Sequence, residues 1–252
     1  MDAEEAIVGW NEIAQRWADT TGKYGDHNKE NVLTPVVLEL LGNVQGMRVL
    51  DAGCGEGYLS RLIAQQGAEV IAVDFSRNLL EIAKGRTPNG SKVTYLHANL
   101  EALIGMEDRS FDVIVSSMVL QDVPDHASAL HEMHRVLKGD GRGILAISHP
   151  CFTSDGSWHR SESGEKLFWR SDNYFYETAR AQQPMPDTQA MIYYFHRTLT
   201  TYFRSFRNAG FLVEDLVEPR PSEDVISRTP GFKNDLRMSH FIVFALRKQK
   251  NG

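Results

Sequence analysis

VLDAGCGEG, residues 49–57, leads directly into YLSRLIA, residues 58–64. Three alternating glycines therefore lie between a short apolar run and an amphipathic helical pattern. Glycine permits the backbone angles of a tight strand-to-helix turn and lets the main chain approach a ligand closely. The free N–H groups at the start of the helix would point back at this turn. The stretch predicts a strand, a ligand-binding turn and a helix.

Two acids accompany the turn and indicate the kind of ligand. Asp51 lies two residues before Gly53, and Asp74 ends the next apolar run, where an acid suits hydrogen bonding to two ribose hydroxyls. Tyr58 fills the place of the third glycine of a dinucleotide fingerprint. Asp51 would repel a pyrophosphate by about 1 to 4 kcal/mol at a separation of about 4 Å. The pattern indicates a nucleoside-bearing cofactor that carries positive charge rather than phosphate.

The composition is that of a globular protein with one substantial core. The chain has 252 residues, 42% of them hydrophobic and 24% charged, and a formal net charge of −6. No apolar run is long enough for a membrane span, and the acidic N-terminus is not a signal peptide. Cys54 and Cys151 are its two cysteines, so we expect a reducing, cytoplasmic setting without a disulfide framework. The one dense basic run, at residues 247–250, is interpreted as a solvated tail, so no nucleic-acid partner is expected.

Strand and helix patterns alternate around the turn, which favours a parallel sheet covered on both faces. We expect helices at residues 58–66, 77–84 and 127–137, with Ser76 as the N-cap of the second. A further helix at 197–209 follows the aromatic-rich segment 149–196. The expected strands lie at residues 48–51, 70–74, 93–97, 111–116, 143–148, 211–217 and 240–247.

Residues 47–148 resemble the core of class I S-adenosylmethionine-dependent methyltransferases, of the small-molecule kind built around a type 11-like domain. The resemblance is carried by residues 49–57, 72–76, 111–120 and 130–141. It implies an α/β fold: a Rossmann-like, doubly wound, seven-stranded sheet whose last strand is antiparallel. It also implies S-adenosyl-L-methionine as the cofactor and S-adenosyl-L-homocysteine as the product.

The resemblance assigns cofactor contacts along the carboxyl edge of the sheet. Asp74 would bind the ribose hydroxyls, with Phe75 beside the adenine and Ser76 next to it. Asn99 and Leu100 occupy the place of an acid that reads the adenine amino group in many relatives, and an asparagine carbonyl can still accept that hydrogen bond. The methionine portion and its sulfonium would be surrounded by Asp51, Gly53, Gly55, Ser117 and Met118.

Two segments outside this core are interpreted as covers, which divides the chain into residues 1–46 and 47–252. The amphipathic pattern at 7–20 predicts a helix that packs on the core, covers the cofactor, or does both. In relatives such a segment often folds over the cofactor, and Trp17 as a cofactor contact, with Tyr24 and His27 nearer the substrate, would suit that role. Residues 149–196, inserted after the fifth strand, are interpreted as a substrate lid, the alternative being a structural cap of packed aromatics.

The acceptor side is harder to read, because a sulfonium is already a good leaving group and positioning alone can supply much of the acceleration. His149 and His196 are candidate general bases, the alternative being an orienting or structural histidine. Arg197 could bind an acceptor carboxylate or simply cap a helix. The remaining substrate candidates are Gln121, at a position where many relatives have histidine, Trp169 and Tyr194.

No metal site is expected. His131 and His134 share a helix face at a ligand-compatible spacing, with Asp122 and Asp125 near them in sequence. That face is opposite the apolar side of the helix, so we interpret it as a solvated surface.

These features favour a cytoplasmic enzyme, a monomer or a homodimer without membrane contact, that methylates oxygen or nitrogen of a small aromatic or apolar metabolite. Two alternatives stay open: an RNA or protein methyltransferase, and a non-catalytic S-adenosylmethionine-binding protein. The first would require a basic groove, and the second a pocket that is closed on the acceptor side.

Overall fold

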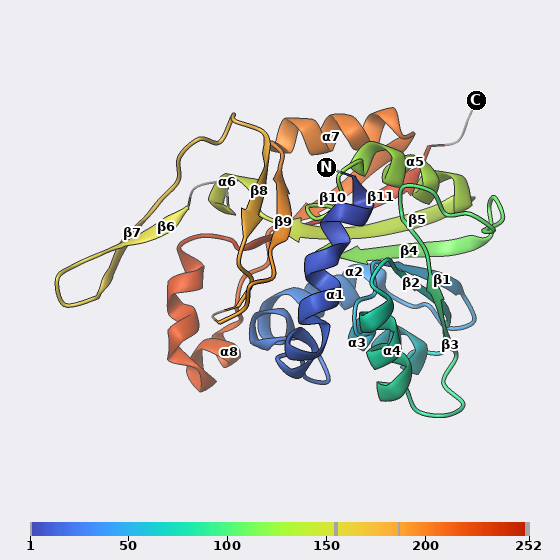
Figure 1. Ribbon diagram of the computed structural model, residues 1–252, viewed down its shortest axis with the longest axis horizontal. Helices are drawn as coiled ribbons and strands as arrows, with labels where there is room; N and C mark the ends of the chain where they lie inside the picture. Colours follow the sequence, from blue (N-terminus) through green and yellow to red (C-terminus); the bar gives the residue numbers. More distant parts are fainter. Residues whose placement is uncertain (1, 154–155, 186, 250–252) are drawn as a thin grey trace.

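A central seven-stranded sheet with helices on both faces forms the body of the molecule (Figure 1). The computed structural model describes residues 2–153, 156–185 and 187–249. Five parallel strands, β1 to β5, are followed after a long insertion by β10 and the antiparallel β11. The strands of the sheet are β1 (Arg48–Ala52), β2 (Glu69–Asp74), β3 (Val93–His97), β4 (Phe111–Ser117), β5 (Leu137–Ser148), β10 (Phe211–Val217) and β11 (Phe241–Lys248).

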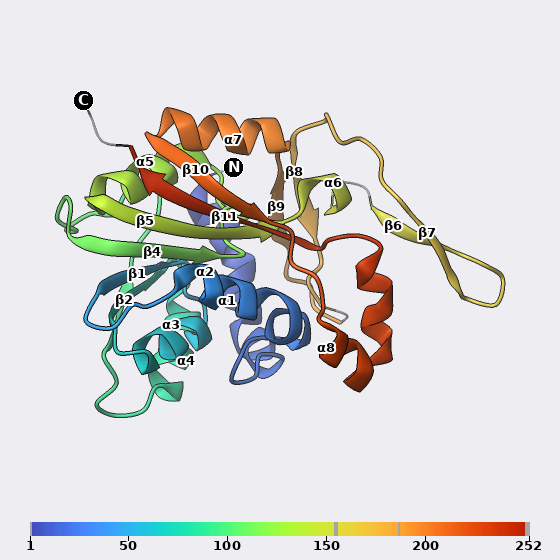
Figure 2. The same cartoon turned by 180° about the vertical axis from the view of Figure 1, so that it is seen from behind.

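The strand order is β10-β11-β5-β4-β1-β2-β3. The last strand, β11, lies between β5 and β10 and runs antiparallel to both (Figure 2). This order confirms the expected Rossmann-like sheet with one antiparallel strand. All seven expected strands are present, with ends that differ by a few residues; β5 extends furthest beyond its prediction, starting at Leu137.

Each face of the sheet buries its own cluster of apolar side chains. Neighbouring residues of a strand point to opposite faces, so Val49 belongs to one cluster and Leu50 to the other. The first cluster includes residues of α2 (Thr34–Leu41), α3 (Tyr58–Gln65) and α4 (Arg77–Arg86). The second includes residues of α5 (His126–Val136) and α7 (Leu199–Asn208). Helices on both faces define the doubly wound arrangement.

The N-terminal helix α1 (Ala3–Asp19) begins with a capping box, in which Asp2 and Glu5 exchange hydrogen bonds. Its Ile13 packs against Ala190 and Ile192 of the lid rather than against the main core. At Gly9 the helix is so close to the lid that an added Cβ would lie 1.9 Å from the carbonyl oxygen of Met191. Helix α1 and the lid therefore form one small packing unit.

The inserted segment is more ordered than its sequence pattern indicates. After the short α6 (Pro150–Thr153), β6 (Ser157–Arg160) and β7 (Lys166–Arg170) form a hairpin that projects from the body (Figure 1). A second hairpin, β8 (Thr178–Gln182) with β9 (Ile192–His196), lies beside α1 (Figure 1). Residues 154–155 and 186, within the predicted lid, lie outside the described part of the chain.

Four further elements, one of them α2 (Thr34–Leu41), occupy stretches for which no helix was expected. Residues before α2 form a π-helical turn, Lys29–Leu33. The proline-containing connection between β10 and β11 holds α8 (Glu223–Arg228) and a 3-10 helix, Pro230–Leu236. None of the helices in the described chain combines the length and the apolarity needed to cross a membrane.

The interpretation of residues 247–250 as a solvated tail is wrong for Lys248, which is a nearly buried residue of β11. Its Nζ donates hydrogen bonds to the carbonyl oxygens of His134, at 2.6 Å, and Leu137, at 2.7 Å. These two carbonyls lie at the C-terminal end of α5, where a cation is favourable. Lys250 lies outside the described residues.

Candidate functional site

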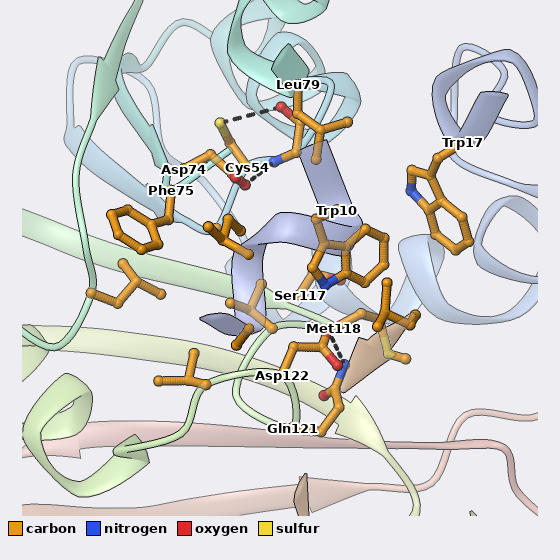
Figure 3. Close-up of a pocket in the computed structure, with 18 of the residues that line it drawn as sticks. Trp10, Trp17, Cys54, Asp74, Phe75, Leu79, Ser117, Met118, Gln121 and Asp122 are labelled. Carbon is orange, nitrogen blue, oxygen red and sulfur yellow. Dashed lines mark hydrogen bonds between the residues drawn. The ribbon is translucent and has the colours of Figure 1, made fainter. Parts of the chain in front are cut away.

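A cavity of about 380 Å³ opens at the carboxyl edge of the sheet, between the strand ends, helix α1 and the second lid hairpin (Figure 3). This volume is in the range of small-ligand sites. The sequence-predicted residues that line it are Trp17, Gly53, Gly55, Asp74, Phe75, Asn99, Leu100, Ser117, Met118, Gln121 and Tyr194.

The three glycines of the turn all have positive φ but meet different surroundings. A Cβ at Gly53 would lie 2.4 Å from Val119, and a Cβ at Gly57 would lie 2.3 Å from the hydroxyl of Tyr95. At Gly55 a Cβ would meet no atom within 4 Å, and this residue lines the cavity. Gly53 and Gly57 thus serve packing, while Gly55 leaves room for a ligand beside the main chain.

Asp74 ends β2 and orients the turn. Its Oδ2 accepts a hydrogen bond of 2.7 Å from Gly55 N, and its Oδ1 one of 2.8 Å from Ser76 N. Burial raises the pKa of this carboxyl, while these N–H donors lower it. Phe75 projects beside it with its ring 5.4 Å from the ring of His97. Ser76 does not line the cavity; as predicted, it caps α4, with its Oγ accepting from Leu79 N.

Asp51 lies behind the turn rather than in the cavity wall. It is almost fully buried, and Ser60 Oγ donates a 2.5 Å hydrogen bond to its Oδ2. Loss of hydration raises the pKa of Asp51 to about 7. The resemblance implies that the carboxyl of Asp51 lies beside the methionine portion of the cofactor. Because Asp51 does not line the cavity, its charge could act on that portion, but its oxygens would not contact it.

At the next strand end, Asn99 and Leu100 line the cavity together with Glu101. The amide oxygen of Asn99 accepts from Glu101 N at 2.9 Å, so one of its lone pairs is already in use. Glu101 carries the nearest carboxylate in the sequence to Asn99 and Leu100, the residues that occupy the place of the acid in the resemblance.

The loop after β4 carries the other polar wall. Met118 has a φ of 64°, a left-handed value that is uncommon for a side chain of this kind and often marks a functional position. Gln121 and Asp122 follow in the cavity wall, and Gln121 Nε2 lies 3.4 Å from Asp122 Oδ2 (Figure 3). In this view they lie on the opposite side of the cavity from Asp74 and Phe75.

Arg197 holds this loop in place. Its guanidinium donates to the carbonyl oxygens of Leu120, Val123 and Pro124 at 2.8 to 3.0 Å. It is 7% exposed and does not line the cavity. The backbone N–H of Phe195 adds a 2.7 Å hydrogen bond to the carbonyl of Gln121. The structure therefore gives Arg197 three backbone partners instead of an acceptor carboxylate.

The two candidate bases lie away from the cavity wall. His149 is buried, its Nε2 is 2.8 Å from Glu218 Oε1, and burial lowers its pKa. His196 is 1% exposed, and its Nε2 donates to the carbonyl oxygen of Tyr174 at 2.8 Å. Neither ring lines the cavity.

The remaining predicted substrate residues are also spread out. Tyr24 is 40% exposed, and the ring of His27 packs on Phe232 at 4.9 Å. Trp169 packs against Trp158 in the first lid hairpin, at 5.5 Å between ring centroids. None of Tyr24, His27 and Trp169 lines the cavity, whereas Tyr194 does.

The wall residues that the sequence analysis did not assign to the site include Trp10, Asp26, Lys29, Tyr58 and Asp122. Trp10 lies about two helical turns before Trp17, and the ring centroids of the two residues are 5.2 Å apart. The helical spacing could therefore have identified Trp10. Asp122 was considered only as a sequence neighbour of His131 and His134, whose helix face was interpreted as a solvated surface. It instead faces the cavity, and His134 packs on Phe211 at 5.3 Å.

The charge of the cavity wall is predominantly negative. Lys29 is the cation among its described residues; its Nζ lies 5.4 Å from the ring centroid of Trp17 and 3.5 Å from Asp26. Burial raises the pKa of Asp122 to about 8. Elevated carboxyl pKa values in an enclosed site favour a ligand that brings positive charge. The acids of the wall are Asp26, Glu56, Asp74, Glu101 and Asp122.

No metal site accompanies these acids: the described residues contain no group of three or more His, Cys, Asp or Glu side chains that could hold an ion.

Comparisons with known proteins agree with this site. A family model described as a methyltransferase domain matches residues 50–145. An uncharacterised protein of Haemophilus influenzae is 27% identical over 224 residues, covering 84% of this chain and 84% of that protein. A ubiquinone biosynthesis O-methyltransferase of Aromatoleum aromaticum is 33% identical over 60% of this chain and 66% of its own length.

Among solved structures, an S-adenosylmethionine-dependent methyltransferase from Mesorhizobium loti matches with a TM-score of 0.76 and 26% identity. The match covers 85% of this chain and 97% of that one. The similarity thus extends well beyond the glycine turn and includes most of the fold described above.

Proposed function

Since the chain is a class I S-adenosylmethionine-dependent methyltransferase, we propose that it methylates an oxygen or nitrogen atom of a small aromatic or apolar metabolite. The observation that carries the proposal is the apolar wall of the cavity beyond Ser117 and Met118, to which Trp10, Ile192 and Tyr194 contribute. Such a wall suits a small, largely apolar molecule, with few polar groups to orient it.

The ubiquinone biosynthesis relatives support an oxygen acceptor, because their names describe O-methylation. They are matched over 57% and 60% of this chain, which leaves the rest of the chain outside the comparison. The proposed class of acceptor therefore rests on the apolar wall of the cavity, and the names of the relatives add support for an oxygen acceptor.

The residues present fit the cofactor. Gly55 leaves open space beside the main chain, and the acidic wall suits a cationic ligand. When bound, S-adenosylmethionine supplies a methyl group on a positively charged sulfur. Asp74 would hold the ribose hydroxyls and Phe75 would lie beside the adenine, with Asn99, Leu100 and Glu101 around it.

At the other end of the cofactor, Lys29 offers the positive charge that a carboxylate needs, and Asp51 adds negative charge from behind the turn. Ser117 and Met118 would line the reacting centre. Helix α1 and the second lid hairpin would exclude water, which strengthens every electrostatic interaction inside the cavity.

A labelling experiment tests this function. The purified protein is incubated with S-adenosylmethionine labelled in its methyl group and, separately, with a small-molecule extract, total RNA and total protein. We expect label in the small-molecule extract alone. Label in RNA or protein would contradict the proposal in favour of a macromolecular substrate, and no label in any fraction would favour a non-catalytic cofactor-binding protein.

A further inference from the structure

Asp122 differs from the other carboxylates of the cavity wall in its hydrogen bonding. Each of the other four accepts at least one hydrogen bond of 3.0 Å or less from the protein. The bonds are Asn28 N and Lys29 N to Asp26 at 3.0 Å, Arg61 to Glu56 at 2.9 Å, Gly55 N to Asp74 at 2.7 Å and Asp125 N to Glu101 at 2.8 Å.

Among the described residues, the Asp122 carboxylate receives one hydrogen bond, the 3.4 Å contact from Gln121 Nε2. This is long for an N–H to oxygen bond. A carboxylate has about four acceptor sites, so most of the capacity of Asp122 is unused. Its side chain is partly accessible and faces the cavity (Figure 3). Asp122 therefore has room for a ligand that donates hydrogen bonds.

Gln121 gives a second, independent sign of a ligand at this place. The side chain lines the cavity and is 4% exposed, and its Oε1 has no hydrogen-bond partner among the described residues. Buried polar atoms without a partner are uncommon and often belong to functional sites. This part of the wall thus holds two neighbouring hydrogen-bond acceptors, the Asp122 carboxylate and the unpartnered amide oxygen of Gln121.

The loop that carries both residues is held firmly. Three carbonyls of the loop are bound by Arg197, and the carbonyl of Gln121 is bound by Phe195 N. Supporting bonds of this kind fix the geometry of a recognition site. The loop also starts at Ser117 and Met118, so Asp122 lies close in sequence to the expected reacting centre.

We propose that Asp122, supported by Gln121, is the acceptor-recognition residue, and that it selects a small molecule whose reacting end is an amine or a hydroxyl. The proposal rests on the proposed function in taking the acceptor to be a small molecule. The carboxylate Oδ atoms accept the N–H or O–H hydrogen of that group and hold it at the wall. A molecule whose polar end is a carboxylate meets two hydrogen-bond acceptors there and is excluded.

The charges around Asp122 agree with this role. Burial raises the pKa of Asp122 to about 8, Lys29, the Gln121 hydrogen bond and Arg197 lower it, and Asp74 raises it. The side chain is therefore an accepting carboxylate above about pH 8, or at lower pH when a cationic amine binds beside it. The donors of Arg197 are already used by the three loop carbonyls, so an amine or hydroxyl of a ligand can still reach the carboxylate.

Probe binding tests the proposal without any methyl transfer. The protein is loaded with S-adenosylhomocysteine at about pH 8.5, above the pKa of Asp122, and calorimetry measures the affinities of benzylamine, benzyl alcohol and benzoate, which differ in their polar group. We expect wild-type protein to bind benzylamine at least about tenfold more tightly than benzoate, with benzyl alcohol between them. In Asp122→Asn the preference should fall to within about threefold.

The matched control is Asp140→Asn, the same chemical change at an exposed acid outside the cavity, and it should keep the wild-type preference. Equal affinities in the wild-type protein, no binding of any probe, or an unchanged preference in Asp122→Asn would each overturn the proposal. If Asp122→Asn does not fold, the comparison of benzylamine with benzoate in the wild-type protein still tests the proposal, because equal affinities would overturn it. Because the probes are only bound, these outcomes are separate from the labelling result that tests the proposed function.

Discussion

Asp51, Asp74 and Asp122 are chemically identical side chains in three different environments. Asp51 is buried behind the turn and bonded to Ser60, whereas Asp74 accepts two backbone N–H groups. Asp122 faces the cavity with a single long contact. Burial raises the pKa of all three, but hydrogen bonding offsets this effect to different degrees. The residues therefore respond differently to pH and to ligand charge.

The raised pKa of Asp51, about 7 against 3.8, has a defined sign for stability. The folded protein binds this proton more tightly than the unfolded chain, so stability falls as pH rises from about 4 through about 7. For Asp51 alone the loss at pH 8 is on the order of 4 kcal/mol when no cation is bound.

We therefore expect the affinity ratio of S-adenosylmethionine to S-adenosylhomocysteine to rise by about tenfold between pH 6 and pH 8.5, because the two ligands differ by one positive charge. Calorimetry at both pH values measures the ratio, and Asp51→Asn should flatten part of the rise. A ratio that does not change with pH in the wild-type protein would contradict this account of the site.

At this scale, sequence reasoning finds residues whose position follows from a short local pattern. Asp74, Phe75 and Gly55 lie within a few residues of the strand ends that fix them, so the motif places them in the cavity. Asp122 is different, because its loop is positioned by Arg197, more than 70 residues later. No pattern around residue 122 contains that information.

At the scale of elements, the loop after β4 is held by one side chain, that of Arg197, which lies just before α7. Removing the guanidinium in Arg197→Ala would leave three carbonyls without their donor and should destabilise the protein by about 2 to 4 kcal/mol. We also expect a larger change in kcat, which should fall, than in the KM for the cofactor. The reason is that this loop lies on the acceptor side of the cavity. Denaturant unfolding and steady-state kinetics measure the two effects.

Arg204→Ala, on the exposed side of the same helix, is the control and should change stability by less than about 0.5 kcal/mol. If Arg197 instead bound an acceptor carboxylate, Arg197→Ala would raise the KM for the acceptor and leave the unfolding free energy unchanged.

Helix α1 offers a second test at the scale of an element. Gly9→Ala places a methyl group 1.9 Å from the Met191 carbonyl, so the helix and the lid have to separate. We expect a loss of about 1 to 3 kcal/mol in unfolding free energy and faster dissociation of S-adenosylhomocysteine, measured by stopped-flow fluorescence.

Gly85→Ala in α4 is the matched control, because a Cβ there meets nothing within 4 Å. This variant should be more stable than the wild type by about 0.5 to 1 kcal/mol and should release the ligand at the normal rate. Normal dissociation from Gly9→Ala would show that α1 does not cover the bound ligand.

The elements of the core were predictable because each pairs or packs through a regular pattern of its own. β1 and β4 each contain a short apolar run that is buried on both faces of the sheet, and α3 and α4 show one apolar face. The lid gave no such pattern. Its strands pair only within two hairpins, and the residues of β6, β7 and β8 are mostly exposed, so no apolar run revealed them. Only β9 alternates regularly, between buried and half-buried residues.

For the molecule as a whole, the lid divides into two parts with different relations to the cavity. The second hairpin contributes Gln182, Ile192 and Tyr194 to the wall, while the first hairpin contributes none of its described residues. Tyr194→Ala should therefore lower kcat/KM for the acceptor found by labelling by about tenfold or more.

Trp169→Ala, in the first hairpin, should change the same kcat/KM by less than about threefold, although the loss of its packing on Trp158 lowers stability. Equal losses of kcat/KM in both variants would restore the sequence-based expectation that Trp169 contacts the acceptor.

The position of β11 has a consequence for how the protein is made. This strand is the last of the sheet to leave the ribosome, yet it pairs with β5 on one side and β10 on the other. Until it arrives, β5 presents an unpaired edge, which is a known template for association with other chains. The nascent polypeptide is therefore most prone to aggregate before β11 has emerged, and premature termination upstream of residue 241 would leave that hazard permanent.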